Sequence, residues 1–246
     1  MKNIHVLLRS YNSYKVFELI KKLSKTGIFS SITVIINEKE DNIDTKNILK
    51  NLSNKIPLYS ISLYDYGWSK ALNAGIKYLI NNHILKDQAE NTFIMPISNE
   101  VKIDKERILL LLETASKDNV SCAYTLFYDR LETTYLLPRN TCLLWKLNVF
   151  HEIGYFNENN DLNMGMEDYE MALRCFQKQN LLPAVIPIKC TLKIRDKAIF
   201  NNKLNNECFA VKLIEENFPK EIVDHLKKHI NNENKKVFKS SKYKVL

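Results

Sequence analysis

Residues 4–36 read IHVLLRSYNSYKVFELIKKLSKTGIFSSITVII, in which two short apolar runs flank a longer segment. The runs at 4–8 and 31–36 are continuous, and the second is rich in β-branched residues, which is typical of buried strands. Residues 14–25 between them are predicted to form a helix. The chain therefore opens with a β-α-β unit.

The same alternation continues along the chain. Further strands are predicted at 58–63, 92–97, 120–127 and 184–188, and further helices at 69–81 and 105–115. Alternation of this kind predicts the α/β class, with a mostly parallel sheet flanked by helices and with ligands at the carboxyl ends of the strands. We expect one main domain in residues 1–195 and a helical, basic extension in residues 196–246.

Composition narrows the class of protein further. A chain of 246 residues, 45% of them hydrophobic, can fill the core of one large α/β domain. Its five cysteines lack CxxC or metal-ligand spacing, which indicates a reducing compartment and disfavours a zinc site. Arg9 closes the first apolar run too early for a signal peptide, and no run approaches the roughly 20 apolar residues of a membrane span. We therefore expect a soluble, cytoplasmic protein.

The spacing of the glycines and the net charge limit the classes of ligand that the protein could bind. The five glycines form neither GxGxxG nor a phosphate-binding loop, which disfavours a dinucleotide-dependent oxidoreductase or a P-loop kinase. The net charge of +8 is compatible with an anionic substrate, a nucleic acid or an acidic membrane surface. Because no RRM, KH, zinc-finger or helix-turn-helix signature is present, we expect no nucleic-acid partner.

Part of the positive charge is concentrated near the C-terminus. The lysines there are Lys227, Lys228, Lys235, Lys236, Lys239, Lys242 and Lys244, interspersed with Asn and Ser. Such a segment is either a solvated or frayed tail, or a surface that adheres to an anionic bilayer. The second alternative predicts peripheral contact with the inner face of a membrane.

Two acidic residues stand at the start of a predicted helix, after a loop that contains glycine. Residues 150–158 read FHEIGYFNE, and residues 165–170 read GMEDYE. Apolar residues then follow the spacing of one buried helix face, at Tyr169, Ala172, Leu173 and Phe176. Glu167 and Asp168 thus fall in or just before the first turn, where backbone N–H groups and the helix dipole favour their ionised forms. They either cap the helix or supply a base to an acceptor.

The segment at 150–174 resembles the acceptor site of family 2 glycosyltransferases, in which an "F..iGgFde" pattern precedes a Glu-Asp pair and a "DlalR"-like helix. The resemblance extends over most of residues 4–195. It implies the GT-A fold, a nucleotide-binding half followed by an acceptor half. It also implies that Asp168 is the general base and that Glu167 supports it.

Two segments resemble parts of the family's donor site. Tyr11 and Asn12 stand where the family typically has the end of "PTYN", although its Pro and Thr are Arg9 and Ser10 here. The turn at 37–41, NEKED, stands where the family has an Asp-rich turn that contacts the base or ribose of the donor. Glu38 is the best match for that role, and a solvated turn is the alternative.

A third segment, GWSKALNAG at 67–75, is similar to the family's "G.s.ArN.G". Ser69 would cap the helix, the small residues would allow close packing on the sheet, and Lys70 and Asn73 would face the nucleotide. The family's Arg is Leu72 here. A capped helix without a nucleotide also explains the pattern.

The main departure from the family lies after the strand at 92–97. The family usually has Asp-x-Asp there, whose carboxylates help to hold Mg²⁺ or Mn²⁺ on the donor diphosphate, whereas this chain has Ser98-Asn99-Glu100. Hard cations prefer carboxylate oxygens, so Glu100 is the predicted metal ligand and Ser98 a donor contact. Fixed cations would otherwise neutralise the diphosphate without a metal, and the candidates are Lys189, Lys193 and Arg195. An ordinary charged surface is the alternative for these three.

The resemblance implies a glycosyltransferase that moves a sugar from a nucleotide-diphosphate donor, UDP-sugar above all, to an acceptor hydroxyl with inversion. A glycan or a lipid-linked acceptor in bacterial glycan or surface polysaccharide assembly is expected. The degenerate Ser-x-Glu also leaves open a catalytically silent relative that binds a nucleotide or sugar, or acts as a scaffold.

Overall fold

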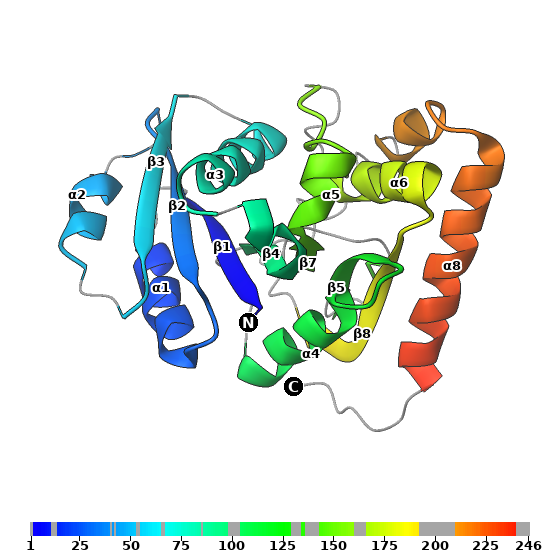
Figure 1. Cartoon of the computed structure of the whole chain (residues 1–246), viewed down its shortest axis with the longest axis horizontal. Helices are drawn as coiled ribbons and strands as arrows, with labels where there is room; N and C mark the ends of the chain where they lie inside the picture. The colour runs from blue at the N-terminus through cyan, green and yellow to red at the C-terminus, as the bar shows by residue number, and fades with distance from the viewer. Residues whose placement is uncertain are drawn as a thin grey trace.

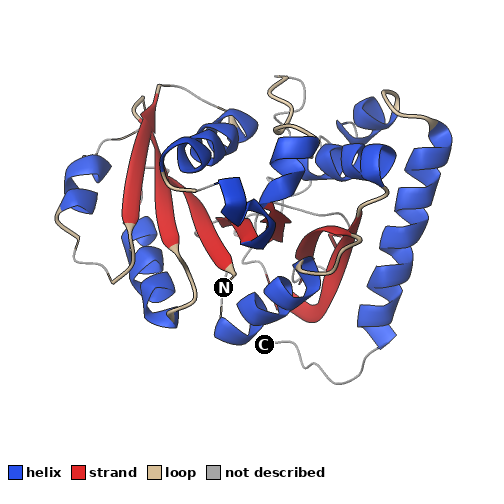
Figure 2. Cartoon of the chain, viewed as in Figure 1, coloured by secondary structure: helices blue, strands red, loops and turns tan. Residues whose placement is uncertain are grey.

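The structure of the protein is a computed structural model. It describes residues 2–10, 14–39, 41, 43–52, 55–64, 67–84, 86–97, 104–128, 134–135, 143–159, 166–191 and 210–239. Strands form one sheet, with helices packed on both of its faces (Figure 2).

The sheet has eight strands in the order β3-β2-β1-β4-β7-β5-β6, with β8 paired to β5. The strands are β1 (Asn3–Ser10), β2 (Ser31–Asn37), β3 (Leu58–Leu63), β4 (Thr92–Ile97), β5 (Val120–Tyr128), β6 (Thr134–Tyr135), β7 (Leu143–Lys146) and β8 (Leu182–Thr191). Among these, β7 is antiparallel to β4 and β5, and β6 is antiparallel to β5, whereas the other pairs are parallel. The predicted α/β class and mostly parallel sheet are confirmed.

Helices cover the two faces of the sheet and are α1 (Lys15–Thr26), α2 (Thr45–Lys50), α3 (Trp68–Asn82), α4 (Lys105–Ala115), α5 (Leu147–Glu152), α6 (Glu167–Gln179) and α8 (Lys220–Lys239), with a short 3₁₀ helix at Lys86–Asn91. The buried residues of α1 and α4 share one apolar cluster, and those of α3, α5 and α6 share another. In Figure 1, α3, α5 and α6 accordingly lie in a row along the upper side. None of the described helices is both long enough and apolar enough to cross a membrane.

Glycine sets the distance between α3 and the sheet. A Cβ added to Gly75 would lie 3.0 Å from a methyl group of Leu7 in β1 and 3.1 Å from one of Ile35 in β2. Side chains in a close-packed interior cannot easily give way, so a larger residue would push the helix outward. The predicted close packing of this segment on the sheet is therefore confirmed.

Residues 210–239, here called the C-terminal segment, pack against α6. Apolar residues from both parts form one cluster, namely Met166, Tyr169, Ala172, Leu173, Ala210, Ile214, Val223, Leu226 and Ile230. The predicted helical extension is confirmed for residues 220–239, and a frayed tail is wrong for them. The predicted division after residue 195 lies outside the described residues.

Candidate functional site

Strand order identifies the edge of the sheet where a ligand would bind. The parallel strands run β3-β2-β1-β4, so the order along the sheet reverses between β1 and β4. In open α/β sheets, ligands bind beyond the carboxyl ends of the strands at such a point. The predicted donor contacts Tyr11, Asn12 and Ser98 and the predicted metal ligand Glu100 follow β1 and β4, but all four lie outside the described residues.

An arginine missed by the sequence analysis lies beside this point. The guanidinium carbon of Arg9, next to the last residue of β1, lies 4.3 Å from the ring centroid of Trp68, the first residue of α3. Guanidinium groups stack favourably on indole faces. The contact joins the "PTYN"-like segment to the "G.s.ArN.G"-like segment. The only local signal was the replacement of a Pro by Arg.

The start of α3 differs from the prediction. Its N-cap is Gly67, which makes no side-chain cap, so the prediction that Ser69 caps the helix is wrong. Ser69 lies one residue inside the helix, where it is 1% exposed. Lys70 follows it and is exposed.

The acidic turn after β2 divides its carboxylates between two environments. Glu38 is exposed, and its backbone N–H donates to the Leu63 carbonyl at 2.9 Å, which holds the turn beside the end of β3. Asp41 accepts from the backbone N–H of Thr45 at 2.9 Å and from its hydroxyl at 2.6 Å. Asp41 thus fixes the start of α2, whereas Glu38 faces solvent.

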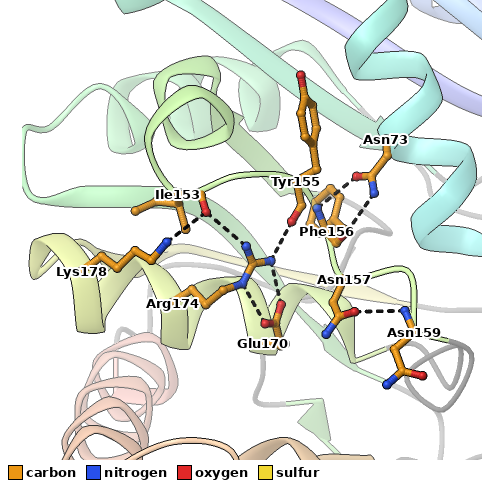
Figure 3. A network of polar contacts seen from close by, with 9 residues as sticks. All are labelled: Asn73, Ile153, Tyr155, Phe156, Asn157, Asn159, Glu170, Arg174 and Lys178. Atoms are coloured by element: carbon orange, nitrogen blue, oxygen red, sulfur yellow. Dashed lines mark hydrogen bonds and ion pairs between the residues drawn. The ribbon is translucent and has the colours of Figure 1, made fainter.

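Asn73 binds the loop that follows α5. Its amide nitrogen donates to the Phe156 carbonyl at 2.8 Å, and its carbonyl oxygen accepts from the Phe156 N–H at 3.0 Å (Figure 3). The same amide nitrogen donates to a Glu158 carboxylate oxygen at 2.8 Å. Asn73 is 1% exposed. Two motifs about 80 residues apart in sequence are thus joined by one side chain. The predicted nucleotide contact of Asn73 stays a prediction.

Arg174 holds the same loop from the side of α6. Its guanidinium binds both carboxylate oxygens of Glu170, at 2.7 and 2.8 Å, and donates to the carbonyls of Tyr155 at 2.8 Å and Ile153 at 3.4 Å (Figure 3). Between those carbonyls, Gly154 has φ +100°, a conformation that L-residues with side chains rarely adopt. The loop at 153–159 is therefore fixed by α3 on one side and by α6 on the other.

Glu167 and Asp168 occupy the first turn of α6, as predicted. The helix begins at Glu167, and its N-cap, Met166, forms no side-chain cap. Both acidic residues are 1% exposed. Burial raises the pKa of the Cys122 thiol well above its usual value, with smaller contributions from Cys175 and from the charge of Asp168. Asp168 therefore lies near β5, the strand that carries Cys122.

Metal ligands were predicted at Glu100, with fixed cations as the alternative. The described residues contain no group of three or more His, Cys, Asp or Glu side chains that would hold a metal ion. Glu100, Lys193 and Arg195 lie outside the described residues, and Lys189 lies in β8. The described residues thus do not form a metal site by themselves.

Together, the mostly parallel sheet flanked by helices and the reversal of strand order at β1 and β4 define a mixed α/β protein with a GT-A-like fold. No protein-family model matches the chain, and no curated protein sequence matches it.

Solved structures of S. aureus TarS are similar to it. Residues 1–349 of TarS align with a TM-score of 0.52 and 17% identity, over 79% of this chain and 59% of that one. The same fragment in complex with UDP aligns with a TM-score of 0.51 and 18% identity, over the same shares of the two chains. A longer TarS structure aligns with a TM-score of 0.55 and 15% identity, over 98% of this chain and 44% of that one. The chain therefore spans less than two thirds of the TarS chains that it matches, and at these identities the likeness shows the fold.

Proposed function

We propose that the protein is a glycosyltransferase that moves a sugar from a nucleotide-diphosphate donor to an acceptor hydroxyl with inversion, as family 2 enzymes do. The observation that carries the proposal is the position of Asp168. It lies in the first turn of α6, the helix that fixes the loop at 153–159 beside α3 in a GT-A-like fold. Burial of two adjacent acids is costly in a protein interior and is common at functional sites.

In the proposed reaction, the acceptor oxygen attacks the anomeric carbon while the bond from that carbon to the donor phosphate oxygen breaks. Asp168 takes the acceptor proton, and the nucleoside diphosphate leaves with the bonding electrons. Glu167 supports Asp168 from the neighbouring position. Because Asp168 is 1% exposed, the acceptor must displace the groups that cover it before the proton can move.

The donor would bind where β1 and β4 end. Glu38 and the side chain of Tyr64, which is 72% exposed directly after β3, would contact the nucleoside. Arg9, Lys70 and the N–H groups at the start of α3 would attract the phosphates. Tyr11, Asn12, Asn73 and Ser98 complete the proposed donor site, with Asn73 acting through the loop that it binds. A UDP-sugar is the proposed donor, since the TarS fragment with this fold has been solved with UDP.

A divalent cation, Mn²⁺ or Mg²⁺, would be held by Glu100 and would stabilise the leaving diphosphate. Lys189, Lys193 and Arg195 would serve the same purpose in a metal-independent enzyme. No step of the proposed reaction depends on the metal. A comparison of turnover with Mn²⁺ and with a chelator distinguishes a metal-dependent from a metal-independent enzyme.

The acceptor is proposed to be a glycan or a lipid-linked sugar in bacterial surface polysaccharide assembly. Exposed lysines on α8, among them Lys228 and Lys235, would bring the protein to the inner face of an anionic membrane. Binding to anionic but not neutral vesicles at physiological salt would support this part of the proposal.

The test combines calorimetry on a panel of nucleotide sugars with transfer assays on wild-type protein and Asp168→Asn. We expect Asp168→Asn to retain donor binding and to lower turnover roughly 100-fold or more. Glu106→Gln is the matched control, because Glu106 is also an acid in a first helix turn, that of α4, but is exposed. Turnover that survives Asp168→Asn would rule out this base.

The replacement of Asp-x-Asp by Ser98-Asn99-Glu100 favours one other candidate, a catalytically silent GT-A-like protein that binds a nucleotide or sugar. Wild-type protein that binds a donor without transferring its sugar would support that candidate.

A further inference from the structure

The C-terminal segment is fastened to the turn of α6 that carries the proposed base. The Tyr169 hydroxyl donates to Glu215 Oε1 at 2.9 Å, and Lys227 Nζ lies 2.6 Å from Oε1 and 2.7 Å from Oε2 of the same carboxylate. Glu215 lies in the helical residues 210–215, and Lys227 lies in α8. One residue after Asp168, α6 is therefore bonded to Glu215, and Glu215 is in turn bonded to Lys227 of α8.

The hydrogen bond between Tyr169 and Glu215 lies in largely buried surroundings, which strengthens it. Tyr169 is 0% exposed, and the Glu215 side chain is 19% exposed. Burial, followed by the charge of Glu215 and its hydrogen bond, raises the pKa of Tyr169, so the hydroxyl stays protonated as a donor. A hydrogen bond to a charged acceptor in such surroundings is stronger than one between neutral groups.

Helix geometry relates this bond to the direction of Asp168. Successive residues of an α-helix are about 100° apart around its axis. Tyr169 faces the C-terminal helices, Glu170 faces Arg174 and the loop at 153–155, and Met171 packs in the cluster against the sheet. Asp168 lies three positions before Met171 and four before Ala172, so it lies between the side that faces the sheet and the side that faces the C-terminal helices. Tyr169 and Glu170, the two residues after Asp168, are thus held on two different sides of the helix. Their contacts fix the rotation of α6 about its own axis.

We propose that Tyr169 and Glu215 are positioning residues, through which the C-terminal segment holds the first turn of α6 so that the Asp168 carboxyl group keeps the position from which it takes the acceptor proton. Lys227 orients the Glu215 carboxylate. The inference rests on the proposed function, because the C-terminal segment is proposed to act by positioning Asp168, the proposed base. It makes residues 210–239 part of the catalytic unit.

Tyr169→Phe is the test, since it removes one oxygen and retains the ring in its cluster. We expect kcat to fall roughly tenfold, with the donor KM and the calorimetric Kd for UDP unchanged, because only the base is displaced. Glu215→Gln should lower kcat similarly, and the double variant should lower it no further, since both act through one bond. Tyr78→Phe on α3 is the matched control and should keep wild-type kcat.

The outcomes separate this inference from the proposed function. Wild-type kcat in Tyr169→Phe, or a kcat loss that is matched by weaker UDP binding, would overturn the positioning role while leaving the transferase proposal intact. Wild-type protein without transfer activity would overturn the proposed function instead. In that case hydrogen exchange still tests whether the Tyr169–Glu215 bond holds the first turn of α6. Amides 167–170 should exchange faster in Tyr169→Phe than in wild type, and unchanged protection would refute this role of the bond.

Discussion

The ion pair between Arg174 and Glu170 should be the main support of the loop at 153–159, and a double-mutant cycle on the pair tests this. The Arg174 side chain is 18% exposed and that of Glu170 is 9% exposed. Arg174 also donates to two backbone carbonyls of the loop. Its replacement therefore removes bonds to a largely buried carboxylate and to the backbone at the same time.

The cost can be worked from these contacts. Removal of one partner of a buried ion pair costs about 3–5 kcal/mol, and we take the lower end for Arg174→Met because the pair keeps some access to water. Glu170→Gln retains one acceptor for the guanidinium, so about 1–2 kcal/mol is expected. The double variant leaves neither charge uncompensated, and its loss should be about 1–2 kcal/mol smaller than the sum of the single losses.

Urea unfolding of the four proteins at pH 7, followed by circular dichroism, measures these free energies. Lys178→Met is the matched control. Lys178 lies one turn after Arg174 on α6, is exposed, and reaches the Ile153 carbonyl at 3.4 Å, so its loss should cost no more than about 0.5 kcal/mol. If Arg174→Met costs as little as this control, or if the two single losses simply add, the pair does not support the loop.

Two further predictions concern backbone strain and pH. Gly154→Ala should destabilise the fold by roughly 1–2 kcal/mol because φ is +100° there, and urea unfolding should show a larger loss than for Gly27→Ala, where φ is +69°; equal losses would contradict the strain argument. Burial, with a smaller contribution from His83, lowers the pKa of His5 to about 4, so the unfolded chain binds the proton first and stability should fall by roughly 3 kcal/mol as the pH drops from 6.5 to 4. His5→Asn should flatten this dependence in melts across that pH range, and an unchanged slope would assign it to other groups.

Much of the fold could be predicted because its strands and helices have strong local patterns. The run at 31–36 forms β2, in which all seven residues Ser31–Asn37 are buried, and α4 has the predicted bounds of 105 and 115. By contrast, β7 and α5 were missed. They follow one another without a break at Lys146 and Leu147, so no glycine or proline marks the boundary, and a strand of four residues is too short for periodicity to show.

The candidate site was less predictable, because its contacts join segments that are far apart in sequence. Glu167 and Asp168 were located from helix periodicity and from the family pattern. The hydrogen-bond partners of Asn73 and Arg174 could not be predicted in this way, since a local pattern does not show which loop will lie beside a helix. A buried Asn inside a helix is itself a signal, because Asn is a poor helix former and its amide needs partners when buried.

These contacts change what the family-like motifs imply. Asn73, Glu170 and Arg174 stabilise the loop at 153–159 through their hydrogen bonds. A protein that kept the fold without the catalytic activity would still need them. Asp168 differs, because the proposed function assigns it chemistry, and groups kept for chemistry often reduce the stability of the fold. An acid kept for catalysis should therefore tolerate Asp168→Asn in urea unfolding better than the structural acid tolerates Glu170→Gln, while transfer shows the opposite order. If Asp168→Asn unfolds as easily as Arg174→Met, Asp168 is a structural acid as well, and its burial no longer favours an enzyme over a silent binding protein.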